Sequence, residues 1–368
     1  MRVLIIGAGI LGSSAAYHLA AQGIEVEIVD EAHQGKATMA GAGIVCPWAT
    51  KVEEPEWYQL YAAGARFYDG LISGLKAKGE ADVGYGKVGA LVVAEDRIEF
   101  EAAAERISRR IKDAPEAGDV RHLMPAEARA LFPPLREDFD AIHIPGAARV
   151  DARLLSAAMV RAAVSFGAIF RSDYVTLDMD GERARCLDSS GLEIRADQII
   201  VTAGAWASQI LRPLGLYHPV VPQKGQIVHL RLPGVATANW PVVLPMSSHY
   251  MLSFDDSRVV IGATREDNAG FDYRVTAAGE LEVLSAGLKI APGLANATLI
   301  ETRIGFRPAG ETMNPILGRV PGFANLTIGN GLGAGGLTIG PFAGSQLAMI
   351  ATDKATDFPL EQYAPKAR

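Results

Sequence analysis

The chain opens with Met1-Arg-Val-Leu-Ile-Ile-Gly7-Ala-Gly9-Ile-Leu-Gly12, and this stretch decides the fold. Residues 3–6 are an unbroken apolar run, which is typical of a parallel strand buried on both faces. Residues 13–22 then have the composition of a helix. The change from strand to helix across a glycine-rich turn predicts the start of a βαβ unit.

The glycines of this turn follow the GxGxxG spacing, and each has its own role. Gly7 permits the tight turn, Gly9 lets backbone amides approach a pyrophosphate, and Gly12 lets the helix pack on the strand. The phosphates would then meet the positive end of the helix dipole. The turn therefore predicts a dinucleotide site.

A second strand and a terminal acid complete the pattern. Residues 25–29 are strand-like, and Asp30 follows them directly. Its carboxylate can accept hydrogen bonds from a ribose 2′-hydroxyl and would repel a 2′-phosphate. The order of these elements favours a dinucleotide site over a plain structural turn and points away from NADP, while FAD and NAD both remain open.

The composition fits an ordinary globular protein. A length of 368 residues allows two domains, and 49% hydrophobic with 21% charged residues excludes disorder for most of the chain. The net charge is −7, and the basic residues are scattered, so we expect no nucleic-acid partner.

Targeting and metal signals are weak in this sequence. The apolar start lacks a basic n-region beyond Arg2, and no run of about 18 apolar residues predicts a transmembrane helix. Cys46 and Cys186 lack disulfide-framework and zinc spacing, so we expect no metal site and a reducing compartment. We therefore expect a cytoplasmic protein, with peripheral association at the inner face of the membrane left open.

Periodicity along the rest of the chain predicts alternating helices and strands. The expected helices are residues 57–78, 98–111, 124–132, 151–166, 281–289 and 342–352. The expected strands are residues 88–94, 168–171, 174–179, 194–202, 226–232, 242–245, 250–254, 258–262, 299–306 and 326–329.

This pattern predicts an α/β fold with two domains. One is a Rossmann-type nucleotide-binding domain, and the other is an α+β substrate domain built on an antiparallel or mixed sheet. We expect the nucleotide-binding domain to be discontinuous, with residues 1–80, 141–218 and 300–368. Residues 81–140 and 219–299 would then form the substrate domain.

A second glycine-rich turn, Asn330-Gly-Leu-Gly-Ala-Gly-Gly-Leu-Thr-Ile-Gly340, separates the cofactor alternatives. A nicotinamide dinucleotide needs one such loop in a domain. A flavin also needs its pyrimidine edge held, which amides at a helix N-terminus can do. The turn therefore favours a flavin, although a flexible surface loop is the alternative reading of its composition.

Several further segments match a known family in their joint order. They are residues 7–12 with Asp30, 36–44, 150–155, 203–206, 221–226, 260–264, 305–308 and 315–318. Over essentially its whole length the chain resembles the glycine oxidase and D-amino-acid dehydrogenase group of FAD-dependent amine oxidoreductases, in the D-amino-acid oxidase superfamily.

The resemblance implies a set of FAD contacts, which adds to the glycines of the first turn. The expected cofactor-binding residues are Gly7, Gly9, Ile10, Leu11, Gly12, Asp30, Glu31, Ala37, Thr38, Ala42, Gly43, Ile44, Val175, Ala203, Gly204, Trp206, Arg307, Gly331, Gly333, Gly335, Gly336, Leu337 and Thr338.

The resemblance also implies that Arg307 binds the substrate carboxylate, helped by the phenol of Tyr250. Two parallel guanidinium donors match a carboxylate, and this contact would aim the substrate Cα–H at flavin N5. Without the resemblance, Arg307 reads more readily as a solvated or salt-bridged arginine and Tyr250 as a sheet aromatic.

The chain departs from the family pattern at three places. Relatives often have a histidine followed by an arginine- or serine-bearing turn where this chain has Asn330 and small residues. Sarcosine oxidases have a flavin-linking cysteine near the position of Gly305 and an oxygen-activating lysine near that of Val260, and this chain has neither. We therefore expect non-covalent FAD, with reactivity toward oxygen left open.

The reaction implied is oxidation of a small amino or imino acid, of the D-amino acid, glycine or N-alkyl glycine class. The Cα hydrogen would leave as hydride to flavin N5, and water would hydrolyse the imino acid to the oxo acid. His249 could hydrogen-bond the amine, or be structural. The electron acceptor, which could be O2, a quinone or another protein, and the oligomeric state are left open.

Three rival functions remain at this point. A 2-hydroxy-acid oxidoreductase of the same fold would need a base for the hydroxyl proton, and His249 is the candidate. A nicotinamide-dependent dehydrogenase would not need the second glycine turn. A non-catalytic nucleotide-binding protein would have no use for Arg307.

Overall fold

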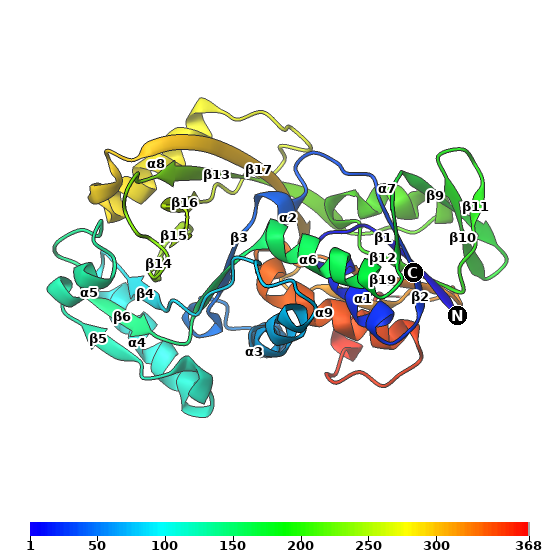
Figure 1. Cartoon of the computed structure of the whole chain (residues 1–368), viewed down its shortest axis with the longest axis horizontal. Helices are drawn as coiled ribbons and strands as arrows, with labels where there is room; N and C mark the ends of the chain where they lie inside the picture. Colours follow the sequence, from blue (N-terminus) through cyan, green and yellow to red (C-terminus); the bar gives the residue numbers. More distant parts are fainter. Residues whose placement is uncertain (367–368) are drawn as a thin grey trace.

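The computed structural model describes residues 1–366, and it consists of two regions side by side along the long axis of the molecule (Figure 1). The region that contains the N-terminus holds a six-stranded sheet, and the other holds an eight-stranded sheet. Two long strands, β13 (Val220–Arg231) and β17 (Thr298–Gly310), pair with each other and reach from the second region toward the first.

The six-stranded sheet is centred on the strand that the first residues predict. β1 (Arg2–Ile6) pairs in parallel with β2 (Glu25–Asp30) on one side and with β12 (Gln198–Val201) on the other. The full order is β18–β19–β12–β1–β2–β8, with β18 antiparallel to β19 at the edge. The remaining strands are β8 (Ile169–Ser172), β18 (Ile316–Arg319) and β19 (Leu326–Asn330).

Helices cover one face of this sheet. α1 (Ile10–Ala21) lies against both α6 (Ala152–Ser165) and α9 (Gly336–Ala351). The contact with α9 is close, since a Cβ at Gly344 would lie 2.5 Å from the carbonyl oxygen of Leu11. The first and last long helices of the chain are thereby packed together.

The opposite face is covered by α7 (Ala207–Leu211) and by a three-stranded sheet, β9–β11. Within β1, Val3 and Ile5 are buried among the helices, whereas Leu4 and Ile6 are buried on the other face. This double burial explains why residues 3–6 are apolar without alternation. The small sheet consists of β9 (Val175–Asp180), β10 (Arg183–Asp188) and β11 (Glu193–Ile194).

The eight-stranded sheet is mixed and has the order β17–β13–β16–β15–β14–β4–β6–β5. α8 (Ala277–Ile290) contacts β13 and β16. The remaining strands are β4 (Ala90–Val93), β5 (Arg121–Leu123), β6 (Ala141–Ile144), β14 (Val242–Pro245), β15 (Tyr250–Ser253) and β16 (Arg258–Gly262). Other elements are α2 (Ala37–Ala40), β3 (Ala42–Val45), α3 (Pro55–Ala77), α4 (Arg97–Arg110), α5 (Pro125–Leu131) and β7 (Ala148–Asp151).

The predicted α/β fold with a mixed second sheet is confirmed, and three local predictions are corrected. The helix expected at 342–352 begins at Gly336, because the glycine turn leads directly into it and Pro341 is accommodated inside. The helix expected from residue 13 begins at Ile10. The expected strand 194–202 is split between β11 and β12, which belong to different sheets. The domain boundaries stay a prediction, and the eight-stranded sheet takes in both β6 and the whole of β17.

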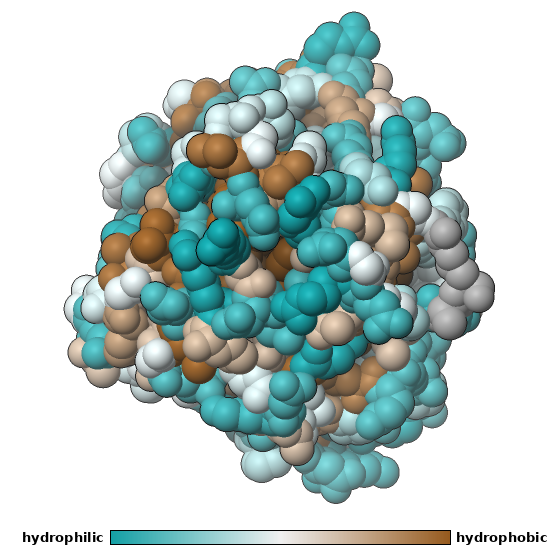
Figure 2. All heavy atoms as spheres, turned by 90° about the vertical axis from the view of Figure 1, so that its right-hand side faces the viewer, coloured by the Kyte–Doolittle hydropathy of each residue, from teal (hydrophilic) through white to brown (hydrophobic). Residues whose placement is uncertain are grey.

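The surface at the β9–β11 end of the molecule is mainly hydrophilic, with hydrophobic residues in separate small groups (Figure 2). Such scattered exposure is ordinary for a protein surface. None of the helices within residues 1–366 combines the length and the apolar character needed to cross a membrane.

Candidate functional site

One continuous cavity reaches from the carboxyl ends of the parallel strands to β13, β15 and β17. Asp30 at the end of β2 lines one part of it, and Tyr250 and Arg307 line another. Ligands of open α/β sheets bind at the carboxyl ends of the strands, where the chain crosses between layers. The cavity therefore joins the predicted nucleotide site to the predicted substrate-binding residues.

The first glycine turn is too crowded for side chains. Gly7 has a φ of +102°, in the region that favours glycine, and a Cβ there would lie 2.6 Å from the carbonyl oxygen of Thr202. A Cβ at Gly12 would lie 1.9 Å from the Gly7 carbonyl oxygen and 2.4 Å from Thr202 Oγ1. Both glycines are required by the backbone itself, and this brings the start of α1 to the cavity wall.

Asp30 is buried at the carboxyl end of the second strand. Its carboxylate accepts hydrogen bonds from the amides of Ala8 (2.6 Å) and Ala32 (2.7 Å), and Lys36 Nζ lies 2.8 Å away. Burial would raise the pKa of Asp30, but Lys36 and the two amides outweigh burial and hold this pKa below its usual value. Asp30 is therefore an anion at neutral pH that ties the first turn to the segment after β2.

The second glycine turn is held by hydrogen bonds that its own side chains make within the turn and to other parts of the chain. Asn330 Nδ2 donates to the Gly204 carbonyl (2.9 Å) and lies 2.9 Å from His218 Nε2, while its Oδ1 accepts from the Gly331 amide (2.8 Å). Thr338 Oγ1 donates to the Ile44 carbonyl at 2.8 Å. The turn is thus a rigid part of the cavity wall and not a flexible surface loop.

Stacked aromatic rings form another wall. Trp206 lies between His33, with ring centres 4.4 Å apart, and Phe271, with ring centres 4.9 Å apart. Phe306 packs edge-on against both Trp206 and Phe271. Trp206 and Phe306 line the cavity, and Phe271, from the loop between β16 and α8, packs on them from outside the lining.

Arg307 presents its guanidinium to the cavity without an acidic partner. It lies against Gly225, where a Cβ would be 2.8 Å from Nη1 and Nη2, and its Nη1 donates to the Thr264 carbonyl at 3.0 Å. Among residues 1–366 it has no carboxylate within 4.0 Å. Burial lowers its pKa, yet a guanidinium stays charged at physiological pH. An unpaired, largely desolvated cation favours an anionic ligand.

Tyr250 lies beside this guanidinium on the wall of the same cavity. Its ring packs on Gly262, where a Cβ would lie 2.5 Å from the phenol oxygen. Burial raises the pKa of Tyr250, although the charges of Arg307 and Arg265 oppose that rise. The phenol is therefore protonated at neutral pH and can donate a hydrogen bond.

His249 is placed differently from the other two proposed catalytic residues. It is not part of the cavity lining, and its Nε2 lies 3.4 Å from a carboxylate oxygen of Glu282 on α8. Burial lowers the pKa of His249, and Glu282 opposes this effect. The structure therefore does not bring His249 together with Tyr250 and Arg307 at the cavity.

Comparisons with known proteins agree with this geometry. Residues 2–350 match the family model described as FAD dependent oxidoreductase (DAO). The chain belongs to this family. It is 68% identical to the crystal structure of iminodiacetate oxidase from Chelativorans sp. BNC1, with 99% of each chain covered and a TM-score of 0.98. It is 46% identical to the uncharacterized oxidoreductase YurR of Bacillus subtilis, over 98% of each chain. The structure of glycine oxidase from Geobacillus kaustophilus matches at 25% identity and a TM-score of 0.86, covering 100% of this chain and 99% of the other.

The cavity of this FAD-dependent oxidoreductase fits an extended dinucleotide. Its lining passes from the glycine turn and Asp30 to Arg307, and Gly9, where a pyrophosphate would approach, is part of that lining. The residues present therefore suit FAD, and the Arg307 guanidinium lines the same cavity.

Most of the residues predicted for FAD line this cavity. They are Gly7, Gly9, Ile10, Leu11, Asp30, Glu31, Ala37, Thr38, Ala42, Val175, Ala203, Gly204, Trp206, Arg307, Gly333, Gly336 and Leu337. The others lie behind the lining and support it. They are Gly12, Gly43, Ile44, Gly331, Gly335 and Thr338.

The cavity also has walls that the sequence did not single out. Lys36, His33, Tyr174, Gly225 and Phe306 line it. Three of these residues lie within segments that carry the family resemblance, namely Lys36, Gly225 and Phe306, so the motifs could have identified them as cavity residues. Nothing in the sequence marks His33 or Tyr174.

The two cysteines lie away from this wall. Cys46 and Cys186 are buried in separate hydrophobic clusters, and burial raises the pKa of each thiol to about 12. Neither sulfur is therefore a thiolate at neutral pH, and within the described residues neither lines the cavity.

Proposed function

We propose that this protein oxidises small N-substituted glycines, with iminodiacetate and sarcosine as representatives, using non-covalent FAD. The observation that carries the proposal is the Arg307 guanidinium, which lines the cavity without a carboxylate within 4.0 Å among the described residues. The likeness to a chain described as iminodiacetate oxidase, at 68% identity, supports the choice of substrate class. The absence of both cysteines from the lining formed by the described residues supports non-covalent FAD.

When bound, FAD supplies a two-electron acceptor for the substrate Cα–H bond. Arg307 then holds the substrate carboxylate through two parallel N–H donors, which fixes the orientation of the α-carbon. Tyr250 stands beside Arg307 and donates its phenolic hydrogen to the same carboxylate. The rings of Trp206, Phe271 and Phe306 exclude water from this side.

The chemistry of the substrate needs no strong side-chain base. A neutral secondary amine loses the Cα hydrogen with its electron pair and a proton from nitrogen, which leaves an imine. Water hydrolyses the imine of an N-substituted glycine to glyoxylate and a primary amine. A 2-hydroxy acid would need a base for its hydroxyl proton. Tyr250 stays protonated and His249 lies off the cavity lining, so the geometry favours the amine.

We propose two roles for the remaining predicted residues. Residues that line the cavity from Gly7 to Trp206 and from Gly333 to Leu337 contact FAD, and those behind the lining hold it in place. We also propose the two-domain division as predicted, with β13 and β17 joining the domains.

Anaerobic mixing of the purified holoprotein with candidate substrates tests the proposal. We expect iminodiacetate or sarcosine to bleach the flavin absorbance faster than glycine, D-alanine or glycolate. A colourless protein that does not bind added FAD, or bleaching by glycolate alone, would overturn it.

A further inference from the structure

The segment after β16 continues to pair with β13 and places Arg265 opposite Gly225. The amide of Lys224 donates to the Glu266 carbonyl (3.1 Å), and the Glu266 amide donates back to the Lys224 carbonyl (2.9 Å). Thr264 N also donates to the Gln226 carbonyl at 3.2 Å. In an antiparallel ladder the next pair is then Arg265 with Gly225, at a position where opposite side chains are closest.

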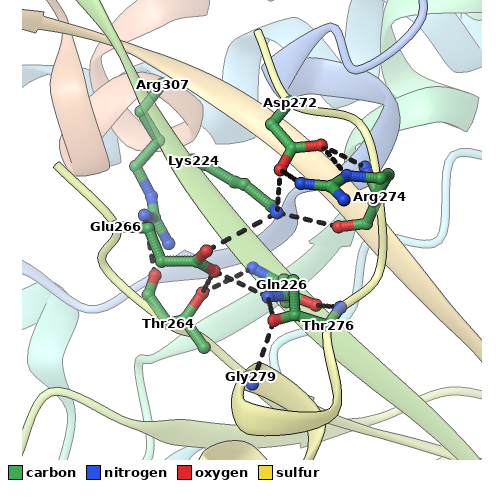
Figure 3. Close-up of polar contacts among 9 residues, drawn as sticks. All are labelled: Lys224, Gln226, Thr264, Glu266, Asp272, Arg274, Thr276, Gly279 and Arg307. Carbon is green, nitrogen blue, oxygen red and sulfur yellow. Dashed lines mark hydrogen bonds and ion pairs between the residues drawn. The ribbon is translucent and has the colours of Figure 1, made fainter. Parts of the chain in front are cut away.

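The neighbours of Arg265 occupy one face of this ladder. Glu266 accepts hydrogen bonds from Thr264 Oγ1 (2.6 Å) and Gln226 Nε2 (2.7 Å), and it lies 3.5 Å from the buried Lys224 ammonium (Figure 3). Gly279 of α8 is close enough to Gln226 that a Cβ there would clash. These side chains therefore point toward α8.

Side chains alternate along an extended segment, so Arg265 points to the other face. That face carries the substrate end of the cavity, where the Arg307 guanidinium occupies the space left by Gly225. The electrostatics agree, because the charge of Arg265 acts on both groups. Burial lowers the pKa of Arg307 and Arg265 lowers it further, whereas burial raises the pKa of Tyr250 and Arg265 opposes that rise.

Arg265 has nothing to neutralise it. It is exposed, and within residues 1–366 it has neither a hydrogen-bond acceptor nor a carboxylate within 4.0 Å. Two guanidiniums near one cavity repel each other, and the charge of Glu266 acts on Arg307 only from beyond 4.0 Å. A monoanionic ligand would compensate one of the charges, whereas a dianionic ligand would compensate both.

We propose that Arg265 binds the second carboxylate of a dicarboxylic imino acid whose first carboxylate is bound by Arg307. The inference rests on the proposed function and narrows its substrate class from N-substituted glycines to those with a carboxylate on the second substituent. In iminodiacetate the two carboxylates stand one carbon away from the nitrogen on either side. Lys224, Gln226 and Glu266 position Arg265 by holding its neighbours on the opposite face.

Arg265→Met tests this in the holoprotein, with anaerobic flavin reduction as the readout. With iminodiacetate we expect the concentration for half-maximal rate to rise about 10–100-fold, as for loss of one charge-assisted hydrogen bond. The limiting rate should change by less than about twofold, and sarcosine, which has one carboxylate, should be unaffected. Arg265→Lys should restore part of the affinity. Arg121→Met removes an exposed arginine at the far edge of the eight-stranded sheet and serves as the control.

Binding of non-oxidised acids separates this inference from the proposed function. Thiodiacetate and acetate are titrated while the flavin absorbance is followed, and Arg265→Met should weaken thiodiacetate alone. If Arg265→Met lowers the affinity for both acids equally, or for neither, the proposed role of Arg265 is overturned. If wild-type protein is reduced by neither iminodiacetate nor sarcosine, the proposed function fails, and the thiodiacetate titration still decides whether Arg265 binds a second carboxylate.

Discussion

At the nucleotide end of the cavity the wall is mainly backbone, whereas at the Arg307 end it is made of side chains carried on separate strands. Gly7 and Gly12 act by having no side chain, and their positions follow from a short local sequence. Tyr250 and Arg307, which we propose act through their functional groups, come from β15 and β17. The first end tolerates almost no change in volume, while the second can be altered with the fold retained.

The largest effect should come from Gly12→Ala, because the added Cβ would overlap the Gly7 carbonyl oxygen. We expect a loss of about 3 kcal/mol or more in stability and little bound FAD. Calorimetry and the ratio of flavin to protein absorbance measure both. Gly70→Ala in α3, where nothing lies within 4 Å of the new Cβ, is the control and should gain about 0.5–1 kcal/mol. A stable yellow Gly12→Ala protein would contradict the claim that the nucleotide end tolerates almost no change in volume.

At the other end, Arg307→Ala should leave the bound flavin in place and abolish most substrate-driven reduction. Loss of a buried charged contact predicts a decrease of about 10²–10³-fold in the second-order rate of bleaching. Stopped-flow absorbance measures it, with Arg121→Ala as the matched control. Reduction at the wild-type rate would exclude Arg307 as a residue that binds the substrate.

Asp30→Ala tests the nucleotide end through a side chain. The change removes the acceptor for two amides and the partner of Lys36, so we expect FAD affinity to fall about 10–100-fold. Equilibrium dialysis against FAD measures this. The rate of flavin reduction in the remaining holoprotein should be unchanged. A slower rate with normal FAD affinity would contradict the assignment of Asp30 to FAD binding.

The smallest effect concerns pH and the second glycine turn. Burial lowers the pKa of His218 to about 4, and neutral Nε2 accepts from Asn330. Because the unfolded chain binds this proton more tightly, stability falls as pH decreases from about 6.5 toward 4. At pH near 5.5 the loss should be about 1 kcal/mol. Urea denaturation across this window should show a shallower dependence for His218→Gln, and an identical slope would exclude His218 as its source.

The sequence predicted the nucleotide end well because its information is local. The spacing of Gly7, Gly9 and Gly12 and the acid after the second strand specify a backbone path that needs no knowledge of distant contacts. Arg307 and Tyr250 were reached through the family resemblance. Periodicity could not show that Arg265 lies opposite Gly225, on which its proposed role depends, since this pairing joins strands distant in sequence.

His249 shows that nearness in sequence can mislead as well. It is adjacent to Tyr250 in the sequence, yet it lies near Glu282 of α8 and not in the cavity lining. His249 lies just before β15, so its nearness in sequence to Tyr250 does not bring it to the same cavity.

The packing of α1 on α9 has a consequence for how the holoprotein is made. The cavity wall includes Gly9 before α1 and Leu337 in α9, and ribosomal synthesis makes Gly9 long before Leu337. A nascent chain cannot enclose FAD until α9 has emerged and docked. FAD binding is therefore a late event in maturation. The yellow fraction of a preparation is the fraction of molecules that have completed folding and bound FAD.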